Sequence, residues 1–358
     1  MNNFDFSKHI YYILIFLAII TAGVLLKITF SFVLPVVVAL FLSCVFYPIV
    51  KKLNTKLHFP WIAGTLLMAV GFVTIITLLS TIIGRSLSTI AGQYTKYESR
   101  FLSIYKIFAD TFNIQFYDDK TFFENIWSQL QVREFLQNAA LSFSSNLLTF
   151  TKNLGMILLY TVFLLIEMKN GSSKIRSIFD GKVSLQIQNM IHKVISETMN
   201  YISIKFLISL ITGIFVFVLL EILKLDFAIM WAFIAFVMNF IPTFGSIISV
   251  GLTTIFAILQ FYPIGYPIII IFAGMTIINL TLGNILEPKI EGDNLDLSPF
   301  VILVSLTFWG WMWGFIGMIL AVPMMVILKI LCENISYLNG FAILLGNKSD
   351  LKKADTID

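Results

Sequence analysis

Charged residues are scarce in this chain. Asp, Glu, Lys and Arg make up 12% of its 358 residues, whereas ordinary soluble domains carry about 25%. The scarcity is most extreme from Phe227 to Leu286, a run of sixty residues that contains no Asp, Glu, Lys, Arg or His. Hydrophobic residues make up 58% of the chain, and its mean hydropathy is +0.91. These values exclude a water-soluble fold and predict an all-α polytopic membrane protein.

Cysteine and histidine are also few. Cys44 and Cys332 lie in separate apolar segments, and His9, His58 and His192 stand far apart in the sequence. Their spacing is not typical of a disulfide framework or a metal site. Paired acids, clustered histidines and a nucleophile beside a base are missing too. The sequence therefore predicts no catalytic, metal or cofactor site, and we do not expect an enzyme.

Two further absences concern the energy source and the partners. The G-x-x-x-x-G-K-[ST] loop that binds ATP phosphates does not occur, because Gly181-Lys182 is followed by Val183 and has no upstream glycine. Transport by this chain would therefore be secondary or channel-like. The net charge of +4 comes from basic residues in short loops beside apolar runs. Such loops are typical of membrane orientation signals, so nucleic acid is not an expected partner.

Long charge-poor runs predict about eight transmembrane helices, because a helix needs roughly 20 residues to cross the hydrocarbon core. The sixty-residue run supplies about three crossings, or fewer if it contains a re-entrant hairpin. The other runs are Ile10–Leu26, Ile28–Val50, Leu57–Gly84, Phe135–Ile166, Phe206–Leu220 and Leu297–Leu328. The last run is long enough to be one tilted helix or two half-helices.

Charge in the connecting segments predicts the orientation. Residues 51–56 are strongly basic, and residues 167–205 hold six basic against three acidic side chains, whereas residues 85–134 hold six of each. The positive-inside rule places the first two segments in the cytoplasm and the third outside. Both termini are then expected in the cytoplasm. The first apolar run is expected to be a retained helix, because no cleavage site follows it.

The predicted organisation has six parts. They are three transmembrane helices in 1–84, an extracytoplasmic amphipathic helical segment in 85–145, a fourth helix in 146–168, a cytoplasmic amphipathic helix in 169–203, a C-terminal transmembrane core in 204–331 with a broken hairpin at 239–246, and a cytoplasmic tail in 332–358. The outer segment has a coiled-coil-like apolar seam. It either covers its own bundle, lies in the membrane interface or contacts another subunit.

The charge-free run is broken at membrane depth by Asn239-Phe240-Ile241-Pro242-Thr243-Phe244-Gly245. Backbone groups freed there must pack in protein or line a wet cavity, because each unpaired group in lipid costs several kcal/mol. Half-helix ends also offer donors and acceptors to a ligand. We therefore place Asn239, Pro242, Thr243, Gly245 and Ser246 in a transport pathway. Its uncharged lining suits a small neutral polar solute, although each polar residue taken singly could instead hold helices together.

A second group of pathway candidates is Asn284, Glu287 and Pro288, at the end of the same run. An acid inside a membrane is by default a candidate for proton or cation handling, and its neighbours suggest a helix end buried in protein. Alternatively, Glu287 snorkels to the interface. The other ionisable residues at span ends, which we expect to snorkel, are Glu167, Lys205, Glu221, Lys224 and Asp226.

The last apolar run carries Gly310, Gly314, Gly317 and Ala321 at steps of four, three and four. Small residues at this spacing let transmembrane helices approach closely, so these positions are predicted to serve helix packing rather than solute contact. Three tryptophans between positions 309 and 313 either anchor at an interface or line a cavity.

Several motifs occur together and in order. They are Asn239-Phe-Ile-Pro242-Thr-Phe-Gly245-Ser, then Gly283-Asn-Ile-Leu-Glu287-Pro288 followed by Gly292 and Leu-Asp-Leu-Ser-Pro299, then the three glycines above with Ala321-Val-Pro323, and near the N-terminus Pro35 and Tyr47-Pro48 before Lys51 and Lys52. In this combination the chain resembles the autoinducer-2 exporter (AI-2E) transporter family over nearly its whole length. It departs from many relatives at Thr243-Phe244, where they carry an aromatic residue straight after the proline.

The resemblance implies a bacterial inner-membrane protein of about eight spans. For some members it implies export of the signal autoinducer-2, and for others exchange of sodium or lithium against protons, so it indicates no single substrate. It also makes a homo-oligomer plausible, with a pentamer as one form.

Three hypotheses of function follow. The first is secondary export of a small polar molecule of the autoinducer-2 type through the pathway residues above. The second is a monovalent cation/proton antiporter in which Glu287, or else Glu221 or Asp226, carries the exchanged charge; the charge-free run counts against it. The third, less favoured, is a membrane scaffold that holds partners through its outer helices. The lipid bilayer is a partner in all three.

Overall fold

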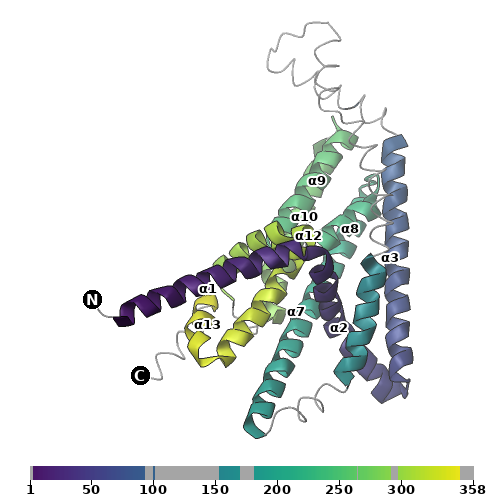
Figure 1. Cartoon of the computed structure of the whole chain (residues 1–358). Coiled ribbons are helices and arrows are strands. Elements are labelled where there is room, and N and C mark those ends of the chain that lie inside the picture. Colours follow the sequence, from purple (N-terminus) through teal and green to yellow (C-terminus); the bar gives the residue numbers. More distant parts are fainter. Residues whose placement is uncertain are drawn as a thin grey trace. The chain divides into compact units, whose positions relative to one another are not determined.

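The computed structural model describes residues 3–92, 100, 153–169, 181–263, 265–291 and 297–346 (Figure 1). Within these ranges the chain is almost entirely helical, and its only β-type pairing is an isolated bridge between Leu297 and Gly346. The all-α prediction is confirmed. Most of the predicted extracytoplasmic segment 85–145 and the end of the tail lie outside the described residues.

The helices follow one another with short connections. Their bounds are α1 Asn3–Ile28, α2 Phe30–Leu57, α3 Trp61–Gly92, an unlabelled helix at 153–169, α7 Gly181–Ile222, α8 Ala228–Met238, α9 Phe244–Phe261, α10 Gly265–Asn279, a π-helical stretch Leu280–Leu286, α11 Glu287–Glu291, α12 Pro299–Asn334, a 3₁₀ turn Ser336–Leu338 and α13 Asn339–Leu345.

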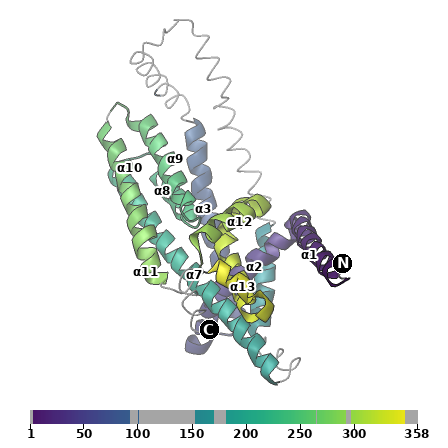
Figure 2. The same ribbon diagram turned by 90° about the vertical axis from the view of Figure 1, so that its left-hand side faces the viewer.

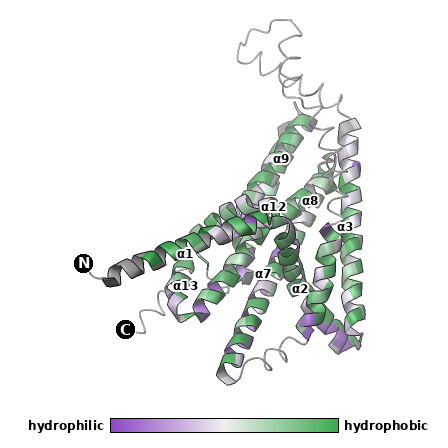
Figure 3. Cartoon of the chain, viewed as in Figure 1, coloured by the Kyte–Doolittle hydropathy of each residue, from purple (hydrophilic) through white to green (hydrophobic). Residues whose placement is uncertain are grey.

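Six of the described helices are long and apolar enough to cross a membrane. They are Phe30–Leu57, Trp61–Ser86, Val183–Ile222, Phe244–Phe261, Gly265–Ile290 and Pro299–Asn334. Two shorter apolar helices cover Phe16–Ile28 and Ala228–Met238. Figure 3 shows hydrophobic residues along the length of these helices. The prediction of a polytopic membrane protein is confirmed, whereas the count of eight spans stays a prediction.

Helix α7 joins two segments that the sequence analysis treated separately. It runs without a break through 42 residues, which is about 63 Å at 1.5 Å per residue. That length is roughly twice the thickness of the hydrocarbon core, so part of α7 must extend beyond it. The expected boundary between the amphipathic helix 169–203 and the next span therefore falls inside one continuous helix.

The chain divides into two compact units. Unit 1 consists of Met1–Leu66, Asn153–Met199 and Asp296–Asp358, and unit 2 consists of Leu67–Lys152 and Asn200–Leu295. Each unit is built from segments far apart in the sequence. The units therefore do not follow the consecutive parts that charge and hydropathy predict.

In unit 1, polar side chains of α2 and α3 bond to the backbone of the helix at 153–169. The Ser43 hydroxyl lies 3.4 Å from the Thr161 carbonyl oxygen, and the Trp61 indole nitrogen donates to the Leu165 carbonyl oxygen at 3.0 Å. The Tyr47 ring packs edge-on against Trp61, with 5.7 Å between ring centroids. These contacts hold the predicted second, third and fourth helices together.

Helix α12 of unit 1 is a hairpin of two half-helices. Trp313 (φ −126°, ψ 15°) and Gly314 (φ 62°, ψ −144°) are not helical. The Ser305 hydroxyl donates to the Ala321 carbonyl oxygen at 3.0 Å, although a straight helix would separate residues sixteen apart by about 24 Å. Of the two forms expected for Leu297–Leu328, the structure has the two half-helices. We call Pro299–Asn334 the α12 hairpin.

The glycines of the last apolar run lie where the two arms of this hairpin meet. A Cβ atom on Gly317 would lie 2.0 Å from the Trp309 carbonyl oxygen, and one on Gly310 would lie 2.8 Å from the Met318 side chain. Gly314 has the positive φ that favours glycine and makes the turn. The small residues thus pack two arms of one chain segment.

Unit 2 contains the central charge-free run. Helices α8, α9 and α10 lie side by side (Figure 2). Buried apolar residues from these helices and from the end of α7 form the core: Val216, Leu220, Met230, Trp231, Ala235, Phe256, Ala257, Ile271 and Met275. Gln260 ties the end of α9 to the α7–α8 turn, because its side chain donates to the Lys224 carbonyl oxygen at 2.9 Å and accepts from the Asp226 N–H at 2.7 Å.

Replacement of Gly245 by alanine should destabilise the protein. A Cβ atom there would lie 1.7 Å from the Met238 carbonyl oxygen and 2.5 Å from its carbonyl carbon, and backbone atoms cannot rotate away as a side chain can. We expect Gly245→Ala to lower the stability by about 1–3 kcal/mol or more. Thermal unfolding of the purified protein in detergent, followed by circular dichroism, measures this.

Gly251→Ala is the matched control in the same helix, because nothing lies within 4 Å of a Cβ atom at Gly251. Alanine favours an α-helix by about 1 kcal/mol over glycine, so this variant should melt at or above the wild-type temperature. Equal melting temperatures for the two variants would contradict the close approach of α8 and α9.

Candidate functional site

The break between α8 and α9 is a tight, strained turn. Thr243 has φ 64° and ψ −56°, and the Phe244 N–H donates to the Pro242 carbonyl oxygen at 2.7 Å. These values describe a three-residue γ-turn of the rare, strained kind. Pro242 supplies a fixed φ and has no N–H to satisfy. Strained backbone of this kind clusters at functional sites, so the turn marks a candidate site.

The turn lies deep along α7. The Asn239 side-chain amide donates to the Ser209 hydroxyl at 3.0 Å. Ser209 is thirteen residues before Ile222, the last residue of α7, so the tip lies about 20 Å from that end. Helix α8 has 11 residues, about 16 Å, and is too short to cross the hydrocarbon core by itself. We call Ala228–Phe261 the α8–α9 hairpin.

Asn239 differs from the hydroxyl-bearing residues of α9 in its hydrogen bonds. Asn239 (8% exposed) and Ser209 (0% exposed) are both buried, and their bond joins two helices. In contrast, the hydroxyls of Ser246, Ser249 and Thr253 donate to carbonyl oxygens of their own chain segment, three or four residues earlier. These three hydroxyls therefore do not bridge helices, and their oxygens can still accept hydrogen bonds.

Glu287 forms an ion pair inside unit 2. The Lys205 ammonium donates to Glu287 Oε1, with only 4% of the lysine side chain and 13% of the glutamate side chain exposed. The expectation that Lys205 snorkels to the interface is therefore wrong, because its ammonium points into the protein and is neutralised there. Burying two charges is tolerated when they pair, whereas removal of one partner costs about 3–5 kcal/mol.

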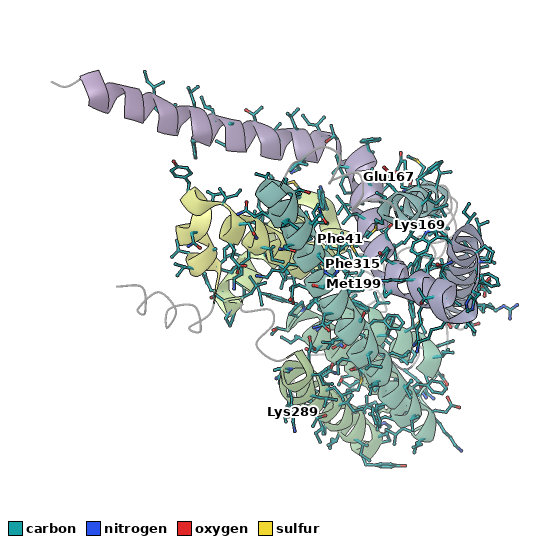
Figure 4. All side chains as sticks on the ribbon, turned by 90° about the horizontal axis from the view of Figure 1, so that it is seen from below. Phe41, Glu167, Lys169, Met199, Lys289 and Phe315 are labelled. Carbon is teal, nitrogen blue, oxygen red and sulfur yellow. The ribbon has the colours of Figure 1, made fainter. Side chains whose placement is uncertain are left out.

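A π-helical stretch precedes this glutamate. Leu280–Leu286 adopts the wider π-helix turn, and the Glu287 N–H bonds to the Leu282 carbonyl oxygen five residues earlier. Such stretches are rare and frequent at functional sites. The change of helical period also changes the face on which the following residues lie. Glu287 therefore reaches Lys205, while Lys289, labelled in Figure 4, is exposed on α11.

The predicted pathway residues divide into three groups by burial. Asn239 and Gly245 are buried, Pro242, Ser246 and Glu287 are half-buried, and Thr243, Asn284 and Pro288 are exposed. The structure brings Asn239 and Glu287 to the same face of α7, through Ser209 and Lys205. It does not bring Asn284 or Pro288 into the buried contacts.

We call Lys205, Ser209, Asn239 and Glu287 the α7 polar site. Lys205 (3% exposed) and Ser209 are four residues apart, about one helical turn or 6 Å along α7. The ion pair has no net charge, and the amide and hydroxyl are neutral. The site therefore offers donors and acceptors to a polar ligand without a bare charge.

Sequence reasoning missed Lys205 and Ser209. The pair partners are 82 and 30 residues apart, so hydropathy could not join them. A weaker signal was present, because Lys205, Ser209 and Thr212 follow steps of four and three within an apolar helix. Polar residues at this spacing lie on one helix face.

The described residues contain no group of three or more His, Cys, Asp or Glu that could hold a metal ion. The buried polar atoms of the α7 polar site are an ammonium, a carboxylate, a hydroxyl and an amide. This set is suited to binding and positioning a polar molecule by hydrogen bonds.

The chain is similar to known transport proteins along most of its length. It is 31% identical to the "Putative transport protein" of Haemophilus influenzae over 341 residues, which cover 93% of this chain and 95% of that protein. It is 29% identical to AI-2 transport protein TqsA of Escherichia coli K12 over 344 residues, 94% of each chain. A "Putative transport protein" of Borreliella burgdorferi is 37% identical over 213 residues, 60% of this chain and 59% of that protein.

The family comparison covers both compact units. The sequence model described as AI-2E family transporter matches residues 14–337, which include α2, both hairpins and the α7 polar site. Together with the six apolar helices of membrane-spanning length, this match makes the protein a multi-pass inner-membrane protein. The chain belongs to the AI-2E family of transporters.

Proposed function

We propose that this protein exports a small polar solute of the autoinducer-2 type by secondary transport, through the α7 polar site of unit 2. The observation that carries the proposal is the Asn239–Ser209 hydrogen bond at the tip of the α8–α9 hairpin, one helical turn from the Lys205–Glu287 pair. The relative named AI-2 transport protein TqsA supports the choice of solute.

The hydrogen bonds of the site suit a neutral solute. The Asn239 amide has a second N–H and a carbonyl oxygen beyond the bond to Ser209, so it can donate to and accept from a ligand. The serine and threonine oxygens of α9 can accept as well. Lys205 occupies the Glu287 carboxylate, so a passing cation would meet no bare negative charge.

The strained turn supplies an element that can change conformation. Thr243 is exposed and held in a positive φ between Pro242 and Phe244, a conformation that costs of order 1–3 kcal/mol. We propose that the turn relaxes when the α8–α9 hairpin moves during transport. The proposal also keeps cytoplasmic termini and a homo-oligomeric assembly, and it assigns no enzymatic step to the chain.

Cation/proton antiport is a second candidate, and the Lys205–Glu287 pair is the observation that favours it. A monovalent cation could take the place of the lysine ammonium beside Glu287, and the displaced lysine could release a proton. The two other acids considered are less suited to this exchange. Glu221 lies sixteen residues, about 24 Å, along α7 from Lys205, and Asp226 follows it in the next turn.

Asn239→Ala should lower autoinducer-2 efflux from proteoliposomes at least about tenfold, because the variant loses an amide that contacts the solute; two neutral hydrogen bonds of about 1 kcal/mol each correspond to roughly this factor. Ser209→Ala removes the same interhelical bond but keeps the amide, so it should retain most of the flux. Efflux is normalised to the amount of inserted protein.

Asn334→Ala is the control for this pair, because the Asn334 side chain bonds only to the Ile330 carbonyl oxygen of its own helix among the bonds described. Its flux should match the wild type. Equal losses in Asn239→Ala and Ser209→Ala would mean that their bond only holds helices together, and would sink the assignment of Asn239 to the pathway.

Lys205→Met should destabilise the protein by about 3–5 kcal/mol, because Glu287 is left charged without its partner. The double variant Lys205→Met with Glu287→Gln should recover most of that stability. Lys193→Met is the control, because the Lys193–Glu333 pair of unit 1 is half-exposed on the lysine side and such pairs contribute about 0–1 kcal/mol. Thermal unfolding in detergent measures all three variants.

The same preparations separate the two candidate functions. The exporter should move autoinducer-2 without a sodium-driven change of internal pH. A sodium-driven pH change that Glu287→Gln abolishes, with no movement of autoinducer-2, would replace the exporter by the antiporter.

A further inference from the structure

The α12 hairpin of unit 1 is a second broken element, built like the α8–α9 hairpin. Its first arm, residues 299–312, is about 21 Å long, too short to cross the hydrocarbon core. The arms meet at Trp313 and Gly314, and the second arm begins at Phe315, which is labelled in Figure 4. Irregular backbone at membrane depth occurs only where it packs in protein or lines a wet cavity.

The tip of this hairpin holds a buried donor without an acceptor. Trp313 is 3% exposed, and its indole nitrogen has no hydrogen-bond partner among the residues that the structure describes. Burial of an unpaired donor costs about 1–3 kcal/mol, so each such group in a native protein requires an explanation. In contrast, the buried indole of Trp61 donates to the Leu165 carbonyl oxygen.

The position of Trp313 separates it from Trp231, the other tryptophan whose buried nitrogen has no partner within the described ranges. Trp231 lies in the regular helix α8, amid the apolar core of unit 2 and 5.1 Å from the Phe256 ring centroid. Trp313 lies at a break where the helix stops and restarts, and the first N–H groups of a restarted helix have no acceptor within that helix. Its unpaired donor therefore has neighbours that also favour an acceptor.

We propose that the tip of the α12 hairpin is a second solute contact, in which the indole N–H of Trp313 donates a hydrogen bond to an oxygen of the transported solute. The inference rests on the transport function proposed above and concerns the class of solute. An indole nitrogen can only donate, so the solute must present a hydroxyl or carbonyl oxygen and cannot be a bare cation.

The ring system beside the donor fits the same class. The Trp309 and Trp313 rings lie against each other, with 4.8 Å between their centroids. Together they give a flat apolar surface next to one N–H group. A small oxygen-rich solute with an apolar face can pack on such a surface while its oxygen accepts the hydrogen bond.

Trp311 provides a matched control two residues away. It is 66% exposed, and the Lys27 ammonium lies 3.5 Å from its ring centroid. Residues two apart on a helix point in different directions, so Trp311 does not share the buried position of Trp313. Phenylalanine at either position keeps an aromatic ring and removes only the indole N–H and part of the ring.

The test is autoinducer-2 efflux from proteoliposomes, measured against internal concentration. Trp313→Phe should raise the half-saturating concentration about five- to tenfold, as expected for one hydrogen bond of about 1 kcal/mol, and Trp311→Phe should stay within about twofold of the wild type. A Trp313→Phe curve that matches the wild type would overturn the inference and leave the proposed function standing. A wild type that moves no autoinducer-2 would overturn the proposed function and this inference with it.

A second measurement on the wild type does not depend on the folding of a variant. Hydrogen–deuterium exchange of the detergent-solubilised protein should slow in peptides covering residues 309–318 when autoinducer-2 is added, because the solute shields the hairpin tip. Unchanged exchange there at a solute concentration that saturates transport would overturn the inference.

Discussion

The need to pair backbone N–H and carbonyl groups in lipid governs this structure. Uninterrupted helices meet that need, and the described chain departs from them in membrane-like segments at three places: the α8–α9 turn, the α12 tip and the π-helical stretch. Each departure lies beside side chains or helices that compensate for it. Asn239 bonds to Ser209, Gly317 brings Trp309 against its own arm, and the π-helical stretch leads to the Glu287–Lys205 pair. The irregular places and the polar places therefore coincide.

The sequence predicted the class of fold and the location of the breaks. Charge-free runs predict helices, and proline or glycine within such a run predicts a break, because both signals are local. Asn239, Pro242 and Gly245 were identified in this way. What could not be predicted is which distant residue each break meets. Ser209 and Lys205 lie on α7, and the pairing of Ser305 with Ala321 depends on the whole chain folding back at Gly314.

The interleaving of the two units has the same origin. Hydropathy divides a membrane chain into consecutive spans, whereas compact units form from the contacts among those spans. The helix at 153–169 packs on α2 and the start of α3 through Thr161 and Leu165, contacts that are more than one hundred residues apart in sequence. Local pattern carries no information about such pairs, and the count of spans is uncertain for the same reason wherever a helix is too short to cross alone.

The hydroxyls of α9 have one more consequence. A row of hydroxyls relays protons only if each one donates to the oxygen of the next side chain. The protons of Ser246, Ser249 and Thr253 are instead committed to backbone carbonyl oxygens, so this row is no proton wire. Solute could then pass along α9 without those side chains conducting protons beside it, and the membrane would keep its electrochemical gradient while the protein works.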